Sequence, residues 1–340
     1  MSRAPWRTPL RDVLARCILA STPQGCGALA CGVLAALLHA PAAASPAACP
    51  ARAPDAEPPG IFEGYEGCNP LGKYYEARRS AAPDWQAVHR CAVQDRNDAV
   101  LMMLHANGFG VPRDIGRAIE HACRVDSAEA EMEGRLEHLR NMQAGRDKKP
   151  FDLCDDITSG MMMGFCADIA ETADGKARND ALAKIGASLA PGPRAKLAAL
   201  RKAGDAFARH VGDIETDLSG TARAALSIGA RAAVQDELLA DLRAAEQGRL
   251  PAGTDAAFAA ADRALNDAYR KVMALPVDEE GRLGYTTVRK QDIRATQRSW
   301  IAYRDAWTAF AQARYPAVPA AAWKTRLTAR RTAQLREWLQ

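Results

Sequence analysis

The sequence predicts an all-α protein built from helical bundle modules. Apolar residues recur with the period of a helix along most of the chain, and no alternating strand pattern runs for more than a few residues. Hydrophobic residues make up 48% and charged residues 25%, with abundant alanine, which is typical of folded chains rich in helix formers. Single cores usually stop growing at roughly 250–300 residues. A chain of 340 residues is therefore expected to form more than one module.

The first 45 residues have the pattern of a secretory signal. Arginines at positions 3, 7, 11 and 16 precede the apolar run "CGALACGVLAALLHA" and the small-residue stretch "PAAAS". The apolar run is shorter than the roughly 20 residues that span a bilayer, which disfavours a membrane anchor. Lipidation at Cys31 or Cys49, each preceded by small residues, is the alternative. We expect a periplasmic or secreted protein, lipid-anchored in that alternative.

Six of the nine cysteines lie beyond the signal, at positions 49, 68, 91, 123, 154 and 166. An even number in an exported chain indicates disulfide bonds. No CxxC motif or histidine pair at ligand spacing is present, so no metal site is predicted. Cys154 and Cys166, separated by a short loop, form the best local pair. Spacing leaves the other connectivities open.

Residues 46–84 are rich in Pro, Ala and Gly and predict a linker followed by loops. Residues 85–150 then contain "AVLMMLHANGFGVPRDIGRAIEHAC", which predicts an αα-hairpin. Gly108 and Gly110 supply the turn, and Pro112 with Asp114 suits the start of the second helix. "GFGVPRD" followed by "RAIEHA" resembles a single Sel-one-like repeat. One such hairpin needs flanking helices to bury its apolar face.

Two further helical modules are expected, at residues 151–250 and 251–340. The segment from Leu197 to Leu242 has the same layout as the segment from Ile293, and Phe207 aligns with Tyr303 when the two segments are compared. This layout suggests a duplicated C-terminal helical domain in which the second copy is the more aromatic.

The second copy contains "ADRALNDAYRKVMAL", "ATQRSWIAYRDAWTAF" and "WKTRLTARRTAQL". These segments resemble the LprI-like lysozyme inhibitor family. The structural signature comprises Asp262, Asn266, Tyr269, Gln297, Trp300, Tyr303, Arg304, Asp305 and Trp307. Relatives commonly have a cysteine pair in this half, whereas no cysteine follows Cys166 here. The resemblance implies an exported, non-enzymatic envelope binding protein with no cofactor and with a lysozyme as its possible protein partner.

Trp300, Tyr303, Trp307 and Phe310 are spaced three, four and three residues apart, which places them on one side of a helix. Such a stripe is what a packed helix needs, so we interpret it as core. An exposed binding stripe is the alternative.

Polar signature residues accompany this stripe. Asp262 and Asn266 lie four apart on the preceding helix, and we expect them to face Arg304 and Asp305 in a network that fixes helix register, or in a polar ligand pocket.

The run "DIETDL" contributes Asp213, Glu215 and Asp217. It lacks the glycine and ligand spacing of a calcium loop, so a solvated helix end capped by Ser219 or Thr221 is expected. Residues 282–340 contain twelve Lys or Arg against three Asp or Glu, whereas residues 151–281 contain fifteen against twenty-one. Animal lysozymes are strongly basic, so the three carboxylates are the possible binding residues for such a partner.

Three function classes follow. The first is the exported binding or inhibitor protein, the second is a structural or interaction adaptor of the bacterial envelope, and the third, less expected, is an enzyme. No catalytic residues are predicted, and export disfavours a nucleic-acid partner.

Overall fold

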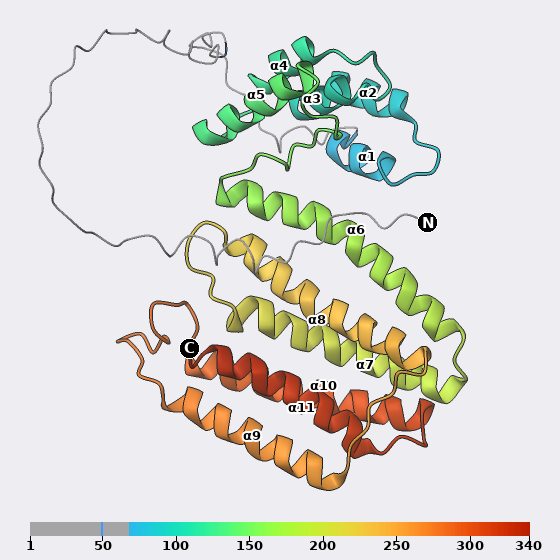
Figure 1. The fold of residues 1–340 in the computed structure, drawn as a ribbon, viewed down its shortest axis with the longest axis vertical. Coiled ribbons are helices and arrows are strands. Elements are labelled where there is room, and N and C mark those ends of the chain that lie inside the picture. Colours follow the sequence, from blue (N-terminus) through green and yellow to red (C-terminus); the bar gives the residue numbers. More distant parts are fainter. Residues whose placement is uncertain (1–48, 50–67) are drawn as a thin grey trace, which may run out of the picture. The chain divides into compact units, whose positions relative to one another are not determined.

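The computed structural model describes Cys49 and residues 68–340, in which eleven α-helices and one short π-helix form (Figure 1). No strand forms in that part of the chain, and the predicted all-α class is confirmed. None of the helices described there combines the length and apolar character that crossing a bilayer requires. The predicted signal, residues 1–45, and the lipidation candidate Cys31 lie outside the described residues.

Five short helices pack around the first hydrophobic core. They are α1 (Pro70–Ala77), α2 (Trp85–Gln94), α3 (Asp98–Asn107), α4 (Ile115–Ala122) and α5 (Glu129–Gln143). The buried face of α3 is unusually broad, because every residue from Ala99 to Ala106 is buried. A helix that is apolar on all sides must be surrounded by its neighbours. Helices α1, α2 and α4 all contact α3, which is therefore the centre of this core.

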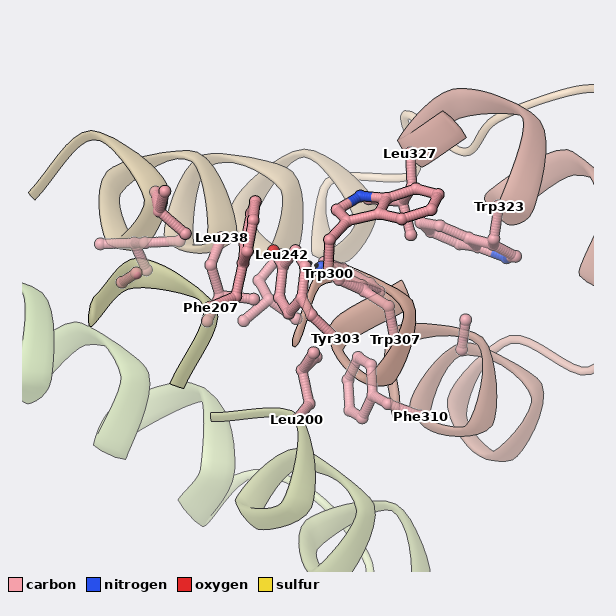
Figure 2. Close-up of a cluster of buried hydrophobic side chains, with 14 of the residues drawn as sticks. Leu200, Phe207, Leu238, Leu242, Trp300, Tyr303, Trp307, Phe310, Trp323 and Leu327 are labelled. Atoms are coloured by element: carbon pink, nitrogen blue, oxygen red, sulfur yellow. Dashed lines mark hydrogen bonds between the residues drawn. The ribbon is translucent and has the colours of Figure 1, made fainter. Parts of the chain in front are cut away.

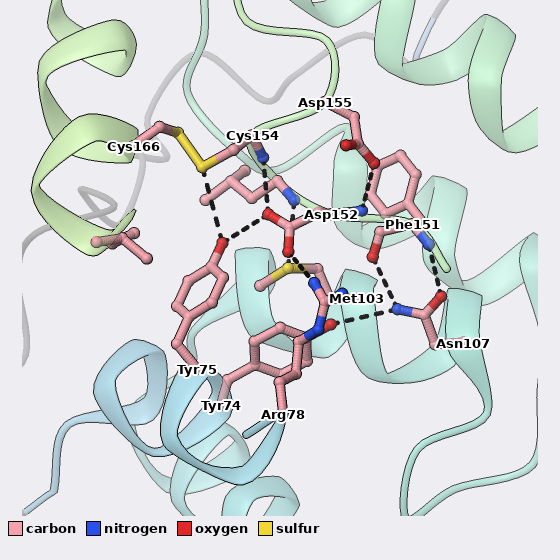
Figure 3. Close-up of polar contacts among 12 residues, drawn as sticks. Tyr74, Tyr75, Arg78, Met103, Asn107, Phe151, Asp152, Cys154, Asp155 and Cys166 are labelled. Carbon is pink, nitrogen blue, oxygen red and sulfur yellow. Dashed lines mark hydrogen bonds and ion pairs between the residues drawn. A yellow bond between two sulfur atoms is a disulfide. The ribbon is translucent and has the colours of Figure 1, made fainter. Parts of the chain in front are cut away.

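Helix α1 corrects the prediction of loop structure up to residue 84. Asn69 caps the helix by accepting a hydrogen bond from the Gly72 amide at 2.8 Å, and Pro70 occupies its first turn. Tyr74 is fully buried, and the Tyr75 hydroxyl donates to Asp152 at 2.7 Å (Figure 3). These contacts to distant residues stabilise an eight-residue helix that its Pro- and Gly-rich surroundings did not indicate.

Helices α3 and α4 form the predicted αα-hairpin. Gly108 ends α3 with φ of +71° and Gly110 has φ of +70°, a region that side chains with a Cβ rarely adopt. Asp114 caps α4 through the Arg117 amide at 3.0 Å. The hairpin is confirmed, while its relation to the Sel-one-like repeat stays a prediction.

Among the residues that the structure describes, three disulfides cross-link the region around the first core: Cys49–Cys123, Cys68–Cys91 and Cys154–Cys166. The last is the pair that spacing favoured, and it closes against Tyr75 and Asp152 (Figure 3). Lipidation at Cys49 is wrong for this structure, because its sulfur is bonded to Cys123.

Six longer helices build the second core. They are α6 (Gly160–Ala187), α7 (Pro191–His210), α8 (Arg223–Glu246), α9 (Asp255–Ala274), α10 (Lys290–Arg314) and α11 (Ala320–Glu337), with the π-helix η1 (Val211–Glu215) directly after α7. Helix α6 contributes Met162 to the first core and Leu182 to the second. At its start, a Cβ on Gly160 would collide with the backbone of Thr221, so glycine permits the close approach of the two segments.

The packing within the second core has a repeated pattern. Helix α8 packs along α6, α11 packs along α9, and the two middle helices, α7 and α10, pack along each other. Phe207 of α7 stacks on Tyr303 of α10, with ring centroids 5.5 Å apart. Phe207 and Tyr303 are the residues that align when the two suggested copies are compared. Equivalent residues of two copies contact each other in this way across a two-fold interface. The duplication itself stays a prediction.

Candidate functional site

The aromatic stripe of α10 is core. Trp300 and Tyr303 are 2% and 4% exposed, and Trp307 and Phe310 are fully buried (Figure 2). The Trp307 indole Nε1 donates a hydrogen bond to the Tyr303 hydroxyl at 3.0 Å, so the polar atoms of both rings are satisfied without a ligand. Trp307 also stacks on Trp323 of α11, with centroids 5.3 Å apart. The stripe therefore joins three helices and offers no binding surface.

The three predicted acidic residues do not form one exposed surface. Glu215 is only 7% exposed, and both of its carboxylate oxygens accept hydrogen bonds from the Arg331 guanidinium at 2.8 Å. The prediction of a solvated Glu215 is wrong because η1 turns this side chain inward against α11. A bidentate buried pair of this kind is neutralised and cannot attract a distant partner.

Asp213 and Asp217 have partners of their own. Asp213 forms an ion pair with Arg231 of α8 and keeps 40% of its side chain exposed. Asp217 accepts hydrogen bonds from Ser219 and from the Thr287 amide, at 2.8 and 3.0 Å. Burial opposes ionisation of Asp217, but these hydrogen bonds prevail and hold its pKa below the usual range. Neither Ser219 nor Thr221 caps α8, whose N-terminus has no side-chain cap.

The polar signature residues form several separate local contacts and not one network between helices. Asn266 donates to Asp262 at 3.0 Å within α9, and Arg304 donates to its neighbour Asp305 at 2.9 Å. The expectation that these pairs face each other is wrong, because α9 packs along α11 and makes little contact with α10. Arg304 instead covers the Trp300 ring, 5.2 Å from its centroid.

Tyr269 packs partly buried at the edge of the second core. Gln297 accepts a hydrogen bond from Arg331 Nε at 3.0 Å. Arg331 itself is 1% exposed, lies 5.8 Å from the Phe207 centroid, and is therefore held by groups from both modules.

A second ion cluster lies along the contact of α8 with α11. Asp241, 5% exposed, accepts hydrogen bonds from Arg326 and from Arg330 at 2.8 Å. Glu237 lies one turn earlier, 3.5 Å from Arg330. Burial raises the pKa of Glu237, and the nearby Arg330 only partly offsets this.

A cavity of about 430 Å³ opens beside these two clusters. Its walls come from η1, α8 and the end of α11, and combine aliphatic, acidic and aromatic groups. The lining residues are Val211, Glu215, Thr216, Ala230, Ala233, Val234, Glu237, Arg331, Gln334, Glu337 and Trp338. Carboxylates outnumber cations on these walls, so the cavity suits a side chain with an apolar stem and a positive head. In the described residues, no group of three or more His, Cys, Asp or Glu side chains is placed to hold a metal ion.

Sequence reasoning missed the Glu215–Arg331 pair. A signal for it exists in α11, where Arg331 lies four residues from both Leu327 and Leu335. That spacing puts the arginine on the apolar face of the helix, where a charge needs a buried partner. Nothing in the sequence identifies Glu215 as that partner across 116 positions.

The fold and the cavity beside the Glu215–Arg331 pair define the class of protein. It is an all-α protein whose C-terminal half is a helical bundle with an aromatic core and a cavity lined by groups of both charges. The family model described as Lysozyme inhibitor LprI matches residues 240–335, which comprise the end of α8, all of α9 and α10, and α11 except its last two residues. This match supports the resemblance of the C-terminal module to that family over residues 240–335. No curated protein and no solved structure matches the chain. Together with the disulfides, the family match indicates an extracytoplasmic protein.

Proposed function

We propose that this protein is exported to the bacterial envelope, where it binds and inhibits a lysozyme-type protein without catalysing a reaction. The observation that supports this proposal most directly is the family match, which covers α9, α10 and most of α11 and includes the aromatic stripe of the second core. The three disulfides support an oxidising compartment.

We place the contact surface on η1 and the adjoining cavity. Asp213 keeps its carboxylate half exposed there, and Glu237 lines the cavity wall. Glu215 is left out of this surface, because its side chain is only 5% exposed and paired with Arg331. Asp213 and Glu237 also have arginine partners, but their side chains remain 40% and 44% exposed. A basic partner would then be attracted by two carboxylates on α8 and η1, and the attraction would weaken with salt.

The test is a binding and inhibition assay with a purified animal lysozyme. We expect inhibition by the exported protein, with affinity that falls as ionic strength rises. The double variant Asp213→Asn, Glu237→Gln should weaken binding by roughly three- to tenfold. Asp267→Asn is the matched control, since Asp267 is an exposed carboxylate that pairs with Lys271 on the outer helix α9.

Two results would contradict the proposal at different levels. Unchanged binding by the double variant would contradict the placement of the contact on the acidic surface but would leave the inhibitor function standing. No binding by the wild-type protein would remove the inhibitor function and favour the envelope adaptor. Export is tested separately, by an intact mass that shows loss of the leader and of the hydrogens of the bonded thiols.

A further inference from the structure

The connection between α9 and α10, residues 275–289, is a braced loop. Asp278 accepts hydrogen bonds from the amides of Glu280 and Arg282, at 3.0 and 2.8 Å, and its own amide donates to the Arg282 carbonyl. Further along, the Leu283 amide donates to the Val288 carbonyl at 2.8 Å. These bonds, made within one short segment, hold the loop in a single hairpin-like shape.

The loop is also anchored at its base. Leu283 and Val288 are 3% and 0% exposed and belong to the second core. Thr287 joins the loop to the first helical module, because its amide donates to Asp217 at 3.0 Å and its hydroxyl accepts from the Leu218 amide at 2.8 Å. The loop and η1 therefore border the same end of the bundle, next to the proposed contact surface.

Tyr285 projects from the tip of this braced loop. Its relative exposure is 105%, whereas the next most exposed large hydrophobic side chain in the described residues, Met161, reaches 61%. Gly284, with φ of +56°, directs the chain at this point. Tyrosine is one of the residues that most often dominate binding energy at interfaces, and a pre-ordered loop reduces the entropy lost on binding.

We propose that Tyr285 is the residue that enters the partner's substrate cleft. This inference rests on the proposed function, and the loop lies inside the matched range 240–335. An enzyme that cleaves polysaccharide has a groove shaped for flat sugar rings, with two carboxyl groups beside the scissile bond. A tyrosine ring fits such a sugar position, and its hydroxyl can donate to one of those carboxylates.

The experiment compares three single variants in binding and inhibition of a purified animal lysozyme. Tyr285→Ala should weaken inhibition at least about tenfold, and Tyr285→Phe, which keeps the ring, roughly two- to fivefold. Leu250→Ala is the matched control, because Leu250 is 41% exposed in the loop between α8 and α9. It should inhibit like the wild type. A soluble chitin oligosaccharide, which occupies the cleft, should compete with the wild-type protein.

The thermal unfolding midpoint of Tyr285→Ala should match that of the wild type, since the ring buries no surface in the free protein. Tyr285→Ala with wild-type inhibition, or binding that the oligosaccharide does not reduce, would overturn the role of Tyr285 while the inhibitor function stands. Wild-type protein that binds no lysozyme would overturn both.

Discussion

The two hydrophobic cores of this molecule are stabilised by different means. Helices α1 to α5 have 8 to 15 residues, and all three disulfides have at least one end in or beside this first core. Helices α6 to α11 have 18 to 28 residues, and no cysteine follows Cys166. Short helices gain little from their own hydrogen bonds and depend on cross-links, whereas long helices with large buried rings do not.

Reduction of the disulfides should reveal the largest difference in stability between the two cores. Each bridge is expected to contribute about 2–5 kcal/mol, so their joint loss exceeds any single substitution. Amide hydrogen exchange of reduced protein should show α2, α3 and α4 losing protection while α7 and α10 keep theirs. Equal loss across all helices would show that the cores unfold as one unit.

The individual bridges sharpen this prediction. Cys49–Cys123 joins residues 74 apart and Cys154–Cys166 joins residues 12 apart. In the chain-entropy account, closing the longer loop removes more freedom from the unfolded chain. Replacing the first pair by serines should therefore lower the free energy of unfolding more than replacing the second, in parallel urea titrations.

In the second core, substitution of Trp307 should lower the free energy of unfolding more than any other single substitution. Trp307→Ala removes a fully buried ring that stacks on Trp323, and should cost about 3–5 kcal/mol through the cavity left behind. Ile301→Ala on the same helix is the control, because Ile301 is 39% exposed and should change stability by under about 0.5 kcal/mol. Similar losses in both variants would contradict the assignment of the stripe to the core.

The buried ion pair predicts a non-additive result. Arg331→Met should cost roughly 3 kcal/mol, because it leaves Glu215 charged and buried without its partner. The double variant Glu215→Leu, Arg331→Met removes both charges and should recover most of that loss. Equilibrium unfolding of the wild type, both single variants and the double variant measures the coupling. Additive losses would mean that the pair contributes through packing alone.

Local patterns in the sequence predicted the features that depend on neighbours along the chain. The spacing of Trp300, Tyr303, Trp307 and Phe310 alone identifies a buried helix face, because the helical period converts sequence distance into direction. Gly108 and Gly110 mark the turn of the hairpin for the same local reason. The short Cys154–Cys166 loop likewise needs no knowledge of the rest of the fold.

Features that depend on distant partners were not predictable in this way. Helix α1 forms because Tyr74 and Tyr75 are buried against residues far along the chain, and Glu215 is buried because Arg331 approaches it from α11. The prediction that Asp262 faces Arg304 was wrong because it assumed that consecutive helices pack against each other. In the structure α9 packs along α11 and not along α10. Periodicity identifies the apolar face of a helix but not the helix that covers it.

Histidine at position 105 gives the smallest expected effect and confines it to the first core. His105 is 7% exposed, its Nδ1 is buried without a hydrogen-bond partner, and its ring stacks on His121, with centroids 5.5 Å apart. Burial lowers the pKa of His105 from its ordinary 6.5, and His121, Arg117 and His89 lower it further, against the weaker opposing effect of Asp114.

Because the folded state resists protonation of this ring, the unfolded chain binds the proton first as the pH falls below about 6.5. The contribution of neutral His105 to stability is then complete above that pH and declines below it. His105→Phe keeps an aromatic ring and removes the titration, so its loss of stability between pH 7.5 and pH 5 should be smaller than that of the wild type. Urea midpoints at both pH values measure this difference. An identical decline in the two proteins would assign the acid sensitivity of the first core to other groups, because Phe at position 105 has no proton to gain.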